Sequence, residues 1–265
     1  MFDRRHKDIR NLPGFGLTAT FAVVFLYLPV IFLAAYSFND GRSISRLDGV
    51  SLRWYVAVWQ NETIHAATAN SLIVATIAAS LGTLLATMAA LAMVRRQFRA
   101  KPAAFAIINL PLMVPEIVTA VATLIFFAAI GVSLGLGAII IAHTVFCIPF
   151  AFLPIRARLI SMDPTLEAAA ADLFATPMMA FRRITLPLLV PGLLSGWLLA
   201  FIVSLDDFII SAMLSGPGST TLPVHIYSML RLGITPEVNA VSSLMIVAST
   251  ILVVASGVIA RNFPK

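Results

Sequence analysis

Six long apolar runs dominate the chain, and short polar segments separate them. Each run has the roughly 20 residues that a helix needs to cross the hydrocarbon core of a bilayer. Only Gly131-Val132-Ser133 separates the third run from the fourth, which predicts a tight turn. We predict an all-α membrane protein with one transmembrane domain over residues 1–265 and six spanning helices, at Phe15–Phe38, Ala66–Val94, Ala103–Ile130, Leu134–Ile155, Leu188–Met213 and Ala240–Ala260.

The first apolar run follows a charged head, as the core of a secretory signal would. It is too long for a cleaved signal, however, and no small-residue cleavage site follows it. We therefore expect it to be retained as the first span.

The lysine and arginine residues are divided unequally between the two sides of the predicted membrane. Of the 18, four fall on one side, at Arg42, Arg46, Arg53 and Arg231. Loops rich in Lys and Arg remain in the cytoplasm. The distribution predicts that both termini are cytoplasmic, together with the other 14 residues: Arg4, Arg5, Lys7, Arg10, Arg95, Arg96, Arg99, Lys101, Arg156, Arg158, Arg182, Arg183, Arg261 and Lys265.

The composition excludes several classes of protein. At 60% hydrophobic and 11% charged residues, with a mean hydropathy of +0.96, the chain is too apolar for a soluble domain. The net charge of +6 is explained by membrane topology, so we expect no nucleic-acid partner. The single cysteine, Cys147, lies in an apolar run, and we expect no disulfide, metal site or cofactor.

The longest polar segment on the predicted cytoplasmic side covers residues 156–187. From Leu166 to Pro187 it reads as a short amphipathic helix, a break near Pro177 and a second short helix that leads into Leu186-Pro187. A helical loop of this length in an otherwise apolar protein predicts a surface that docks a partner. An ordinary amphipathic surface helix is the alternative.

Three functional classes fit a bundle of six spans: a secondary carrier, a membrane-embedded enzyme, and the translocation subunit of a machine driven by a partner. A carrier is expected to have inverted repeats, and none is evident. His143 is the only histidine within a predicted span, and no catalytic motif surrounds it. No GxxxxGK[ST] motif occurs, so a partner must handle any ATP. The partner-driven permease leads, without catalytic residues of its own; the carrier remains its rival.

The segment from Leu166 to Pro187 resembles the cytoplasmic loop of permease subunits in ABC-type importers, which is written EAA, three residues, G, nine residues, I-x-L-P. When Ile184, Leu186 and Pro187 are placed on its end, Phe174 occupies the glycine position and Glu167 lies one residue early. A bulky Phe does not favour the sharp turn of the family. The resemblance implies that this loop couples to an ATPase through Glu167, Ala168, Ala169, Ala170, Asp172, Leu173, Phe174 and Ala175.

The resemblance extends over most of the chain. Ser195–Pro223 and Tyr227–Ala240 are similar to the polyamine branch of this superfamily, and most similar to the second permease of bacterial putrescine/spermidine importers. This implies the MetI-like type I importer fold in the bacterial inner membrane. It also implies binding-protein-dependent transport with a second permease subunit, two ATPase subunits and a periplasmic solute-binding protein. A permease for another small solute remains open.

Three acidic residues lie within predicted spans: Glu116, Asp206 and Asp207. Such residues are costly in a membrane and usually face a polar cavity or a partner. An anionic pathway suits a cationic solute. Trp197, on the same predicted span as Asp206 and Asp207, could hold an alkylammonium group by cation–π attraction. The alternative is that the acids cap breaks in the helices. We expect His143 and Asn109 to form hydrogen bonds between helices.

Two outer segments, Asp40–His65 and Leu214–Asn239, are the only sizeable ones on the other side. The second contains SGPGSTTLP, which should break a helix, and an amphipathic run at Ile226–Leu232. In the family such segments receive the binding protein, but interfacial helices fit equally. We expect Trp54, Tyr55 and Trp59 to lie in the interfacial aromatic belt.

Overall fold

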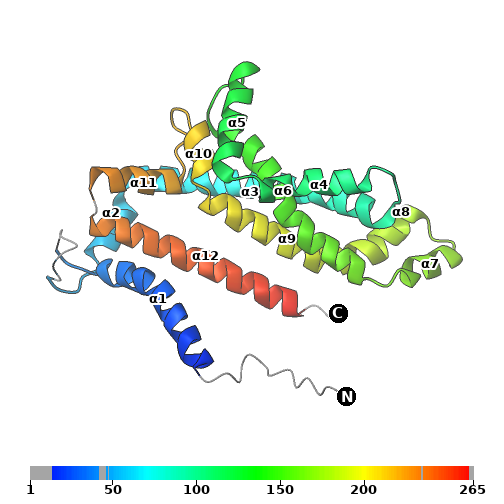
Figure 1. Ribbon diagram of the computed structural model, residues 1–265, viewed down its shortest axis with the longest axis horizontal. Coiled ribbons are helices and arrows are strands. Elements are labelled where there is room, and N and C mark those ends of the chain that lie inside the picture. The colour runs from blue at the N-terminus through cyan, green and yellow to red at the C-terminus, as the bar shows by residue number, and fades with distance from the viewer. Residues whose placement is uncertain (1–13, 42–45, 47, 234, 263–265) are drawn as a thin grey trace, which may run out of the picture. The chain divides into compact units, whose positions relative to one another are not determined.

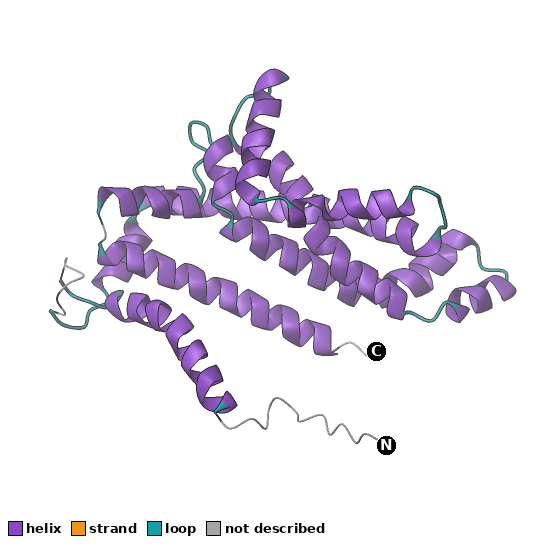
Figure 2. Cartoon of the chain, in the orientation of Figure 1, coloured by secondary structure: helices purple, strands orange, loops and turns teal. Residues whose placement is uncertain are grey.

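The computed structural model describes residues 14–41, 46, 48–233 and 235–262, and every regular element within these ranges is a helix (Figures 1 and 2). The all-α prediction is therefore confirmed. The elements are α1 (Phe15–Tyr36), α2 (Arg53–Gln60), α3 (Glu62–Arg95), α4 (Lys101–Met113), α5 (Glu116–Ala129), α6 (Leu136–Ser161), α7 (Thr165–Asp172), α8 (Pro177–Ala180), the π-helix η2 (Phe181–Thr185), α9 (Leu186–Asp206), α10 (Ile209–Leu214), α11 (Leu222–Leu232) and α12 (Pro236–Asn262).

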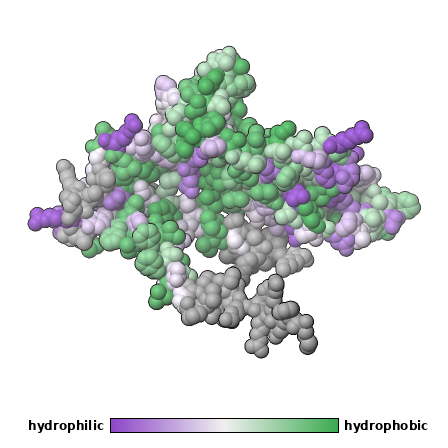
Figure 3. All heavy atoms as spheres, in the orientation of Figure 1, coloured by the Kyte–Doolittle hydropathy of each residue, from purple (hydrophilic) through white to green (hydrophobic). Residues whose placement is uncertain are grey.

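Five helices in the described ranges are long and apolar enough to cross a membrane, or six if one bent pair counts as a single span. The five are Gly16–Tyr36, Glu62–Arg95, Leu136–Ser161, Pro177–Asp206 and Pro236–Ala255. Apolar side chains cover much of the face in Figure 3. In α1, Phe21 and Leu26 are each 69% exposed, as expected of a helix that faces lipid. The membrane prediction therefore agrees with the fold.

Two predicted spans are broken rather than continuous. The single span predicted at Ala103–Ile130 consists of two helices, α4 and α5, which meet at an angle of 105°. Val114 is extended because the proline after it disfavours the helical region, and Pro115 caps α5 without an N–H of its own. The single span predicted at Leu188–Met213 is also divided. Helix α9 ends at Asp206, and α10 follows after the extended Asp207. Both breaks place acidic residues at helix ends inside apolar sequence.

Close contacts gather the chain into two units: Met1–Asn61 with Met229–Ile246, and Glu62–Ser228 with Val247–Lys265. Their masked residues include Arg4, Arg5, Lys7, Arg10, Arg42 and Lys265, which lie outside the described ranges. The cytoplasmic position of the termini and the single domain over residues 1–265 stay predictions.

In the first unit, α2 is held by hydrogen bonds rather than by an interfacial belt alone. Trp54 is buried, and its Nε1 donates to the carbonyl of Asn39 at 2.7 Å. The hydroxyls of Tyr55 and Ser37 lie 2.7 Å apart. Trp59 is 77% exposed and remains the residue best suited to the predicted belt.

The second unit is built on close packing of α3, α6 and α9. Small residues allow this approach: a Cβ on Gly82 would lie 3.0 Å from Cβ of Cys147, and one on Gly196 would lie 2.8 Å from the carbonyl oxygen of Ala151. Membrane helices commonly pack through such small residues. A second apolar cluster joins α5, α6 and α10 around Ile139, Ile210 and Leu214.

The outer segment after α10 is tied to α3. As predicted, SGPGSTTLP interrupts the helix, since α10 ends at Leu214 and α11 begins at Leu222. Nδ2 of Asn70 donates to the carbonyls of Gly218 and Thr220, at 3.0 Å each. The N–H of Leu222 donates to the hydroxyl of Ser71 at 2.8 Å. The predicted amphipathic run forms the second half of α11.

Candidate functional site

A cavity of about 550 Å³ lies in the second unit where α5, α6, α9 and α10 meet. It brings together the three acidic residues that the sequence singles out, although they come from two different helix breaks. None of its nine lining residues is Lys or Arg; they are Glu116, Phe146, Phe150, Ile202, Val203, Asp206, Asp207, Phe208 and Ile209. The arrangement is an acidic, aromatic cavity.

Asp207 is the most constrained of the three acids. Its side chain is buried, and Oδ1 accepts a hydrogen bond from the N–H of Ser211 at 3.0 Å. Its other oxygen, Oδ2, is buried and has no hydrogen-bond donor among the described residues. The carboxyl of Glu116 lines the same cavity as Asp207. Two adjacent carboxylates therefore favour a shared proton or a bound cation.

His143 is the partner of Asp207 that sequence reasoning missed. The Nε2 atom of His143 lies 3.1 Å from Oδ1 of Asp207, and both side chains are about 1% exposed. Nδ1 of His143 lies 2.7 Å from the hydroxyl of Ser204 in α9, and Nε2 lies 3.2 Å from that of Ser211 in α10. His143 thus joins helices, as predicted. Asn109 instead donates to the Phe105 carbonyl of its own helix at 2.8 Å.

Asp206 occupies a different environment from its neighbour. It is exposed, lines the cavity, and accepts a hydrogen bond from the hydroxyl of Ser249 at 3.3 Å. Asp206 is the last residue of α9, whereas Asp207 is extended and buried. The expectation that these acids cap helix breaks is met in part by Asp207, because its carboxylate accepts a hydrogen bond from the N–H of Ser211 in the first turn of α10. It is not met by Asp206.

Aromatic rings contribute one wall of the cavity. Phe146 and Phe150 lie one turn apart on α6, with ring centroids 5.4 Å apart. The ring of Phe208 packs on Tyr227 at 4.7 Å. Sequence reasoning placed Trp197 in the pathway, but Trp197 is not among the lining residues. Its Nε1 donates to the hydroxyl of Ser80 at 3.1 Å, and its ring stacks on Phe201 at 5.2 Å.

The second candidate region is the loop between α6 and α9. Its start is fixed by Asp163, whose Oδ1 accepts hydrogen bonds from the N–H of Thr165 at 2.9 Å and from the Thr165 hydroxyl at 2.7 Å. These hydrogen bonds lower the pKa of Asp163 below its usual value. The predicted order is confirmed: α7, a break before Pro177, and a short helix that continues into α9.

The turn after α7 forms even though a Phe occupies the glycine position. Phe174 has φ of 61°, the only positive value at a non-glycine position in the described ranges. The N–H of Phe174 donates to the carbonyl of Ala171 at 2.9 Å, and that of Ala175 to the carbonyl of Ala170 at 3.0 Å. The left-handed conformation costs a non-glycine residue about 1–2 kcal/mol. The chain therefore maintains the sharp turn at an energetic cost.

The eight residues expected to couple to an ATPase differ in how far their side chains are exposed to solvent. Ala170 is buried, while Glu167 and Ala175 are half-buried. We call residues Ala168–Ala175 the tip segment. Its exposed members include two large apolar side chains, Leu173 at 81% and Phe174 at 96% exposure, and the smaller or polar Ala168, Ala169 and Asp172.

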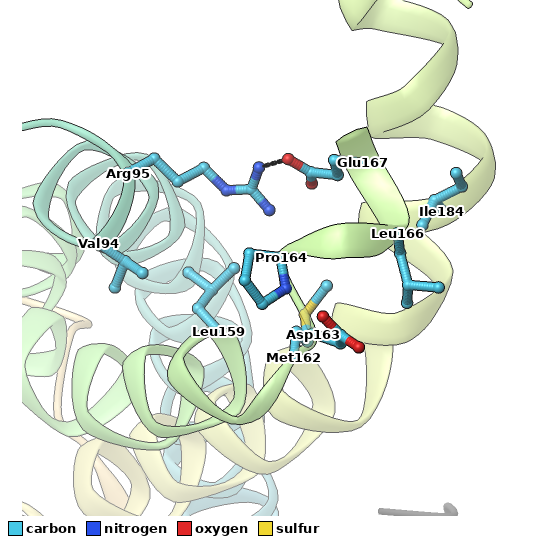
Figure 4. A pocket seen from close by; sticks show the side chains of 9 residues that line it. All are labelled: Val94, Arg95, Leu159, Met162, Asp163, Pro164, Leu166, Glu167 and Ile184. Carbon is cyan, nitrogen blue, oxygen red and sulfur yellow. Dashed lines mark hydrogen bonds and ion pairs between the residues drawn. The ribbon is translucent and has the colours of Figure 1, made fainter. Parts of the chain in front are cut away.

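Glu167 turns inward, toward its own chain. One of its oxygens accepts a hydrogen bond from Nη1 of Arg95, and the other accepts one from the hydroxyl of Thr185. These contacts border a cavity of about 340 Å³ whose wall is otherwise mostly apolar (Figure 4). The residues that line it are Val94, Arg95, Leu159, Met162, Asp163, Pro164, Leu166, Glu167 and Ile184.

Comparison with protein families and known proteins shows the family of the chain. Residues 82–264 match the family described as "Binding-protein-dependent transport system inner membrane component". The chain is 36% identical over 256 residues to the spermidine/putrescine transport system permease protein PotC of Escherichia coli strain K12, covering 97% of this chain and 96% of PotC. It is 40% identical to PotC of Haemophilus influenzae, covering 90% and 93% of the two chains.

A putrescine permease is also similar. The putrescine transport system permease protein PotI of Escherichia coli strain K12 is 39% identical over 229 residues, which cover 84% of this chain and 82% of PotI. Each of these relatives is named as a permease of a transport system for one or two polyamines.

Solved structures share the fold at lower sequence identity. A chain of a bacterial ABC transporter involved in the import of the acidic polysaccharide alginate superposes with a TM-score of 0.69 at 19% identity, covering 94% of this chain and 93% of that one. A chain of the MetNI methionine ABC transporter, in an inward-facing conformation, gives a TM-score of 0.62 at 23% identity, covering 77% and 100%. At these identities the similarity establishes the fold alone.

Proposed function

Because the chain belongs to the family of binding-protein-dependent transport system inner membrane components, we propose that it forms half of the pathway through which an ATP-driven importer carries polyamines into the bacterial cytoplasm. One observation carries the choice of solute. Three carboxyl groups share a cavity of about 550 Å³ whose lining residues include no Lys or Arg. The relatives named as spermidine/putrescine and putrescine permeases support the same choice.

The charge of the cavity suits a cation. Ionised carboxylates at membrane depth are costly unless something compensates their charge. Asp207 has His143 beside it, but Oδ2 of Asp207 is without a donor in the described ranges. A primary ammonium group has three donors and a positive charge, so it can satisfy Oδ2 and the carboxylates of Glu116 and Asp206.

The aromatic wall suits the rest of a polyamine. Polyamines alternate ammonium groups with short methylene chains. Ammonium groups are attracted to aromatic faces by about 0.5–2 kcal/mol, and Phe146, Phe150 and Phe208 supply such faces. Ile202 and Val203 give apolar contact for the methylenes. The carboxylates and the aromatic rings of the cavity together therefore fit a polyamine better than they fit a simple metal cation.

The chain itself carries out transport and not hydrolysis. ATP hydrolysis belongs to two ATPase subunits, and the exposed tip segment, Ala168–Ala175, is the surface that receives one of them. A second permease subunit completes the pathway, and a periplasmic binding protein delivers the solute. The assembly lies in the inner membrane as a multi-pass complex. In this proposal Asp206, Asp207 and Glu116 contact the solute, and Trp197 lies along the pathway away from the cavity.

Two alternative functions compete with this proposal: an importer for another small solute and a stand-alone secondary carrier. Fold alone does not select a solute, because the solved neighbours include an alginate importer and a methionine transporter at 23% identity or less. An importer for another small solute would share the loop but would not require the acids. A stand-alone secondary carrier would transport without partners.

Uptake by reconstituted vesicles tests the proposal directly. The complete complex should accumulate radiolabelled putrescine or spermidine only with the binding protein outside and ATP on the side of the ATPase subunits. Vesicles that contain this chain alone should accumulate none, and uptake by the chain alone would favour a carrier. An uncharged diol of the same length should not compete with the polyamine. ATP-driven uptake of a different solute, with no polyamine uptake, would overturn the choice of solute.

A further inference from the structure

Glu167 joins three parts of the second unit that are distant in sequence. It lies in the first turn of α7, Arg95 is the last residue of α3, and Thr185 ends the π-helix before α9. Each carboxylate oxygen of Glu167 has its own partner, Arg95 at one and Thr185 at the other. Figure 4 shows the side chain of Arg95 extended toward Glu167 across the edge of the cavity. The carboxylate is therefore committed to its own chain.

The hydroxyl of Thr185 differs from those of four threonines inside the longer helices α3, α5 and α6. A helical threonine commonly donates to the carbonyl four residues earlier. Thr185 is buried, yet its hydroxyl leaves its own helix and donates to Glu167. The usual pattern is followed by Thr68, Thr87, Thr123 and Thr144.

The π-helix places this hydroxyl. Residues Phe181–Thr185 form a wider turn between α8 and α9. Short π-helical turns are rare, and they occur frequently at functional sites. In this turn the backbone remains helical while Thr185 faces Glu167. The first turn of α7 and the start of α9 are thus linked by a side chain and not only by the intervening loop.

The two helices that these contacts reach, α3 and α9, are packed closely against α6. Gly192 and Gly196 on α9 leave no room for a Cβ beside α6, and Gly82 on α3 approaches α6 at similarly short range. Well-packed interiors transmit displacement because they have few voids to absorb it. Close packing of this kind would carry a movement applied at the loop along α9 to its end, where Asp206 lines the acidic cavity.

We propose that Glu167 is a positioning residue that transmits movement of the tip segment, Ala168–Ala175, to α3 through Arg95 and to α9 through Thr185. The exposed side chains of the tip segment face outward, whereas Glu167 holds the segment to the helices that move. The inference rests on the proposed function, because it requires an ATPase subunit that displaces the loop.

The test measures ATP hydrolysis and polyamine uptake in the same preparation of the complete complex. Arg95→Gln, Glu167→Gln and Thr185→Val each remove one part of the link. Each should lower the uptake per ATP hydrolysed by at least about fivefold, the low end of typical couplings between sites. The subunits should still co-purify in the normal ratio. Arg96→Gln is the matched control, since Arg96 is exposed and its side chain has no partner among the described residues.

Two further variants separate coupling from folding. The double variant Arg95→Gln with Glu167→Gln should be no worse than Glu167→Gln alone, because Glu167→Gln already removes the carboxylate that Arg95 contacts. The exchange of charges, Arg95→Glu with Glu167→Arg, should restore part of the ratio. Additive losses, no recovery on exchange, or an unchanged ratio in all variants would overturn the inference. If the wild-type complex itself transports no polyamine, the proposed function fails instead.

Discussion

His143 and Asp207 form a contact that lies inside the apolar part of the second unit, with 3.1 Å between Nε2 of His143 and Oδ1 of Asp207. The imidazole is fixed at its other nitrogen by Ser204, so it cannot rotate without losing a second hydrogen bond. Asp207 follows the last residue of α9, where the chain is extended. This contact orients the carboxylate at the break between α9 and α10, with Oδ1 engaged and Oδ2 without a donor in the described ranges.

The first prediction concerns His143. Replacing it with Leu removes one hydrogen-bond partner from the buried carboxylate of Asp207, and leaving a buried polar group short of a partner costs about 1–3 kcal/mol. We expect a sharp fall in thermal stability of the purified complex. His143→Gln retains one amide donor for Asp207 and should be much less destabilised. Thermal unfolding of the two variants in detergent checks this, and equal stability of both would show that the contact with Asp207 contributes little.

The second prediction concerns the two aspartates. Asp206→Asn should reduce polyamine uptake at least about tenfold, which corresponds to about 1.4 kcal/mol in the transport barrier. Its hydrogen bond to Ser249 can be kept by the amide oxygen, so assembly should not change. Asp207→Asn should reduce uptake similarly and should also lower stability, because it weakens the contact with His143. Uptake and thermal stability are measured on the same complexes.

Glu116 provides the comparison for these variants. It lies in the first turn of α5, where a carboxylate is stabilised by the helix N-terminus whether or not it meets the solute. Glu116→Gln should therefore reduce uptake less than either aspartate variant. Binding of polyamine to the isolated periplasmic protein is the control and should stay constant. If both aspartate variants assemble and transport at the original rate, the acidic pathway is wrong.

The lengths of the apolar runs predicted most of the helices correctly. They could not reveal the two breaks, because apolar residues continue on both sides of each break. Proline alone does not mark them: Pro29, Pro111, Pro149, Pro154 and Pro191 all lie inside helices that continue. Pro115 disfavours the helical region at Val114, but the sequence alone does not distinguish Pro115 from the prolines that helices accommodate.

The candidate site shows the same limit. The cost of an acid at membrane depth was sufficient to select Glu116, Asp206 and Asp207. The pairing of Asp207 with His143 was not predicted, because no spacing rule joins residues from separate helices. His143 and Ser204, which lie on the same network, are 61 positions apart. Similarly, the ring pair of Phe146 and Phe150 resembles any apolar helix face until α10 is packed beside it.

The third prediction concerns Phe174, which the sequence placed at the glycine position of the loop. Its φ of 61° is unfavourable for a side chain by about 1–2 kcal/mol, and glycine removes this cost. Phe174→Gly should therefore be tolerated and should retain the turn. Part of the gain will be offset by the greater freedom of glycine in the unfolded chain. Thermal unfolding of the complex measures the balance, and Phe174→Ala is the control, since it shortens the side chain but keeps the strain.

The last prediction concerns the docking role of the tip segment. Ala169 is exposed on α7, and a small side chain there permits close approach of a partner surface. Ala169→Arg should abolish the stimulation of ATP hydrolysis by the solute-loaded binding protein while the chain still inserts and pairs with the second permease. Ala170→Arg is less informative, because Ala170 is 8% exposed and a buried arginine would disrupt α7 itself. Ala103→Arg places the same charge near the N-terminal end of α4, at an exposed alanine outside the loop, and is the matched control. Full stimulation in Ala169→Arg, or an equal loss in Ala103→Arg, would contradict the assignment of the tip segment as the ATPase dock.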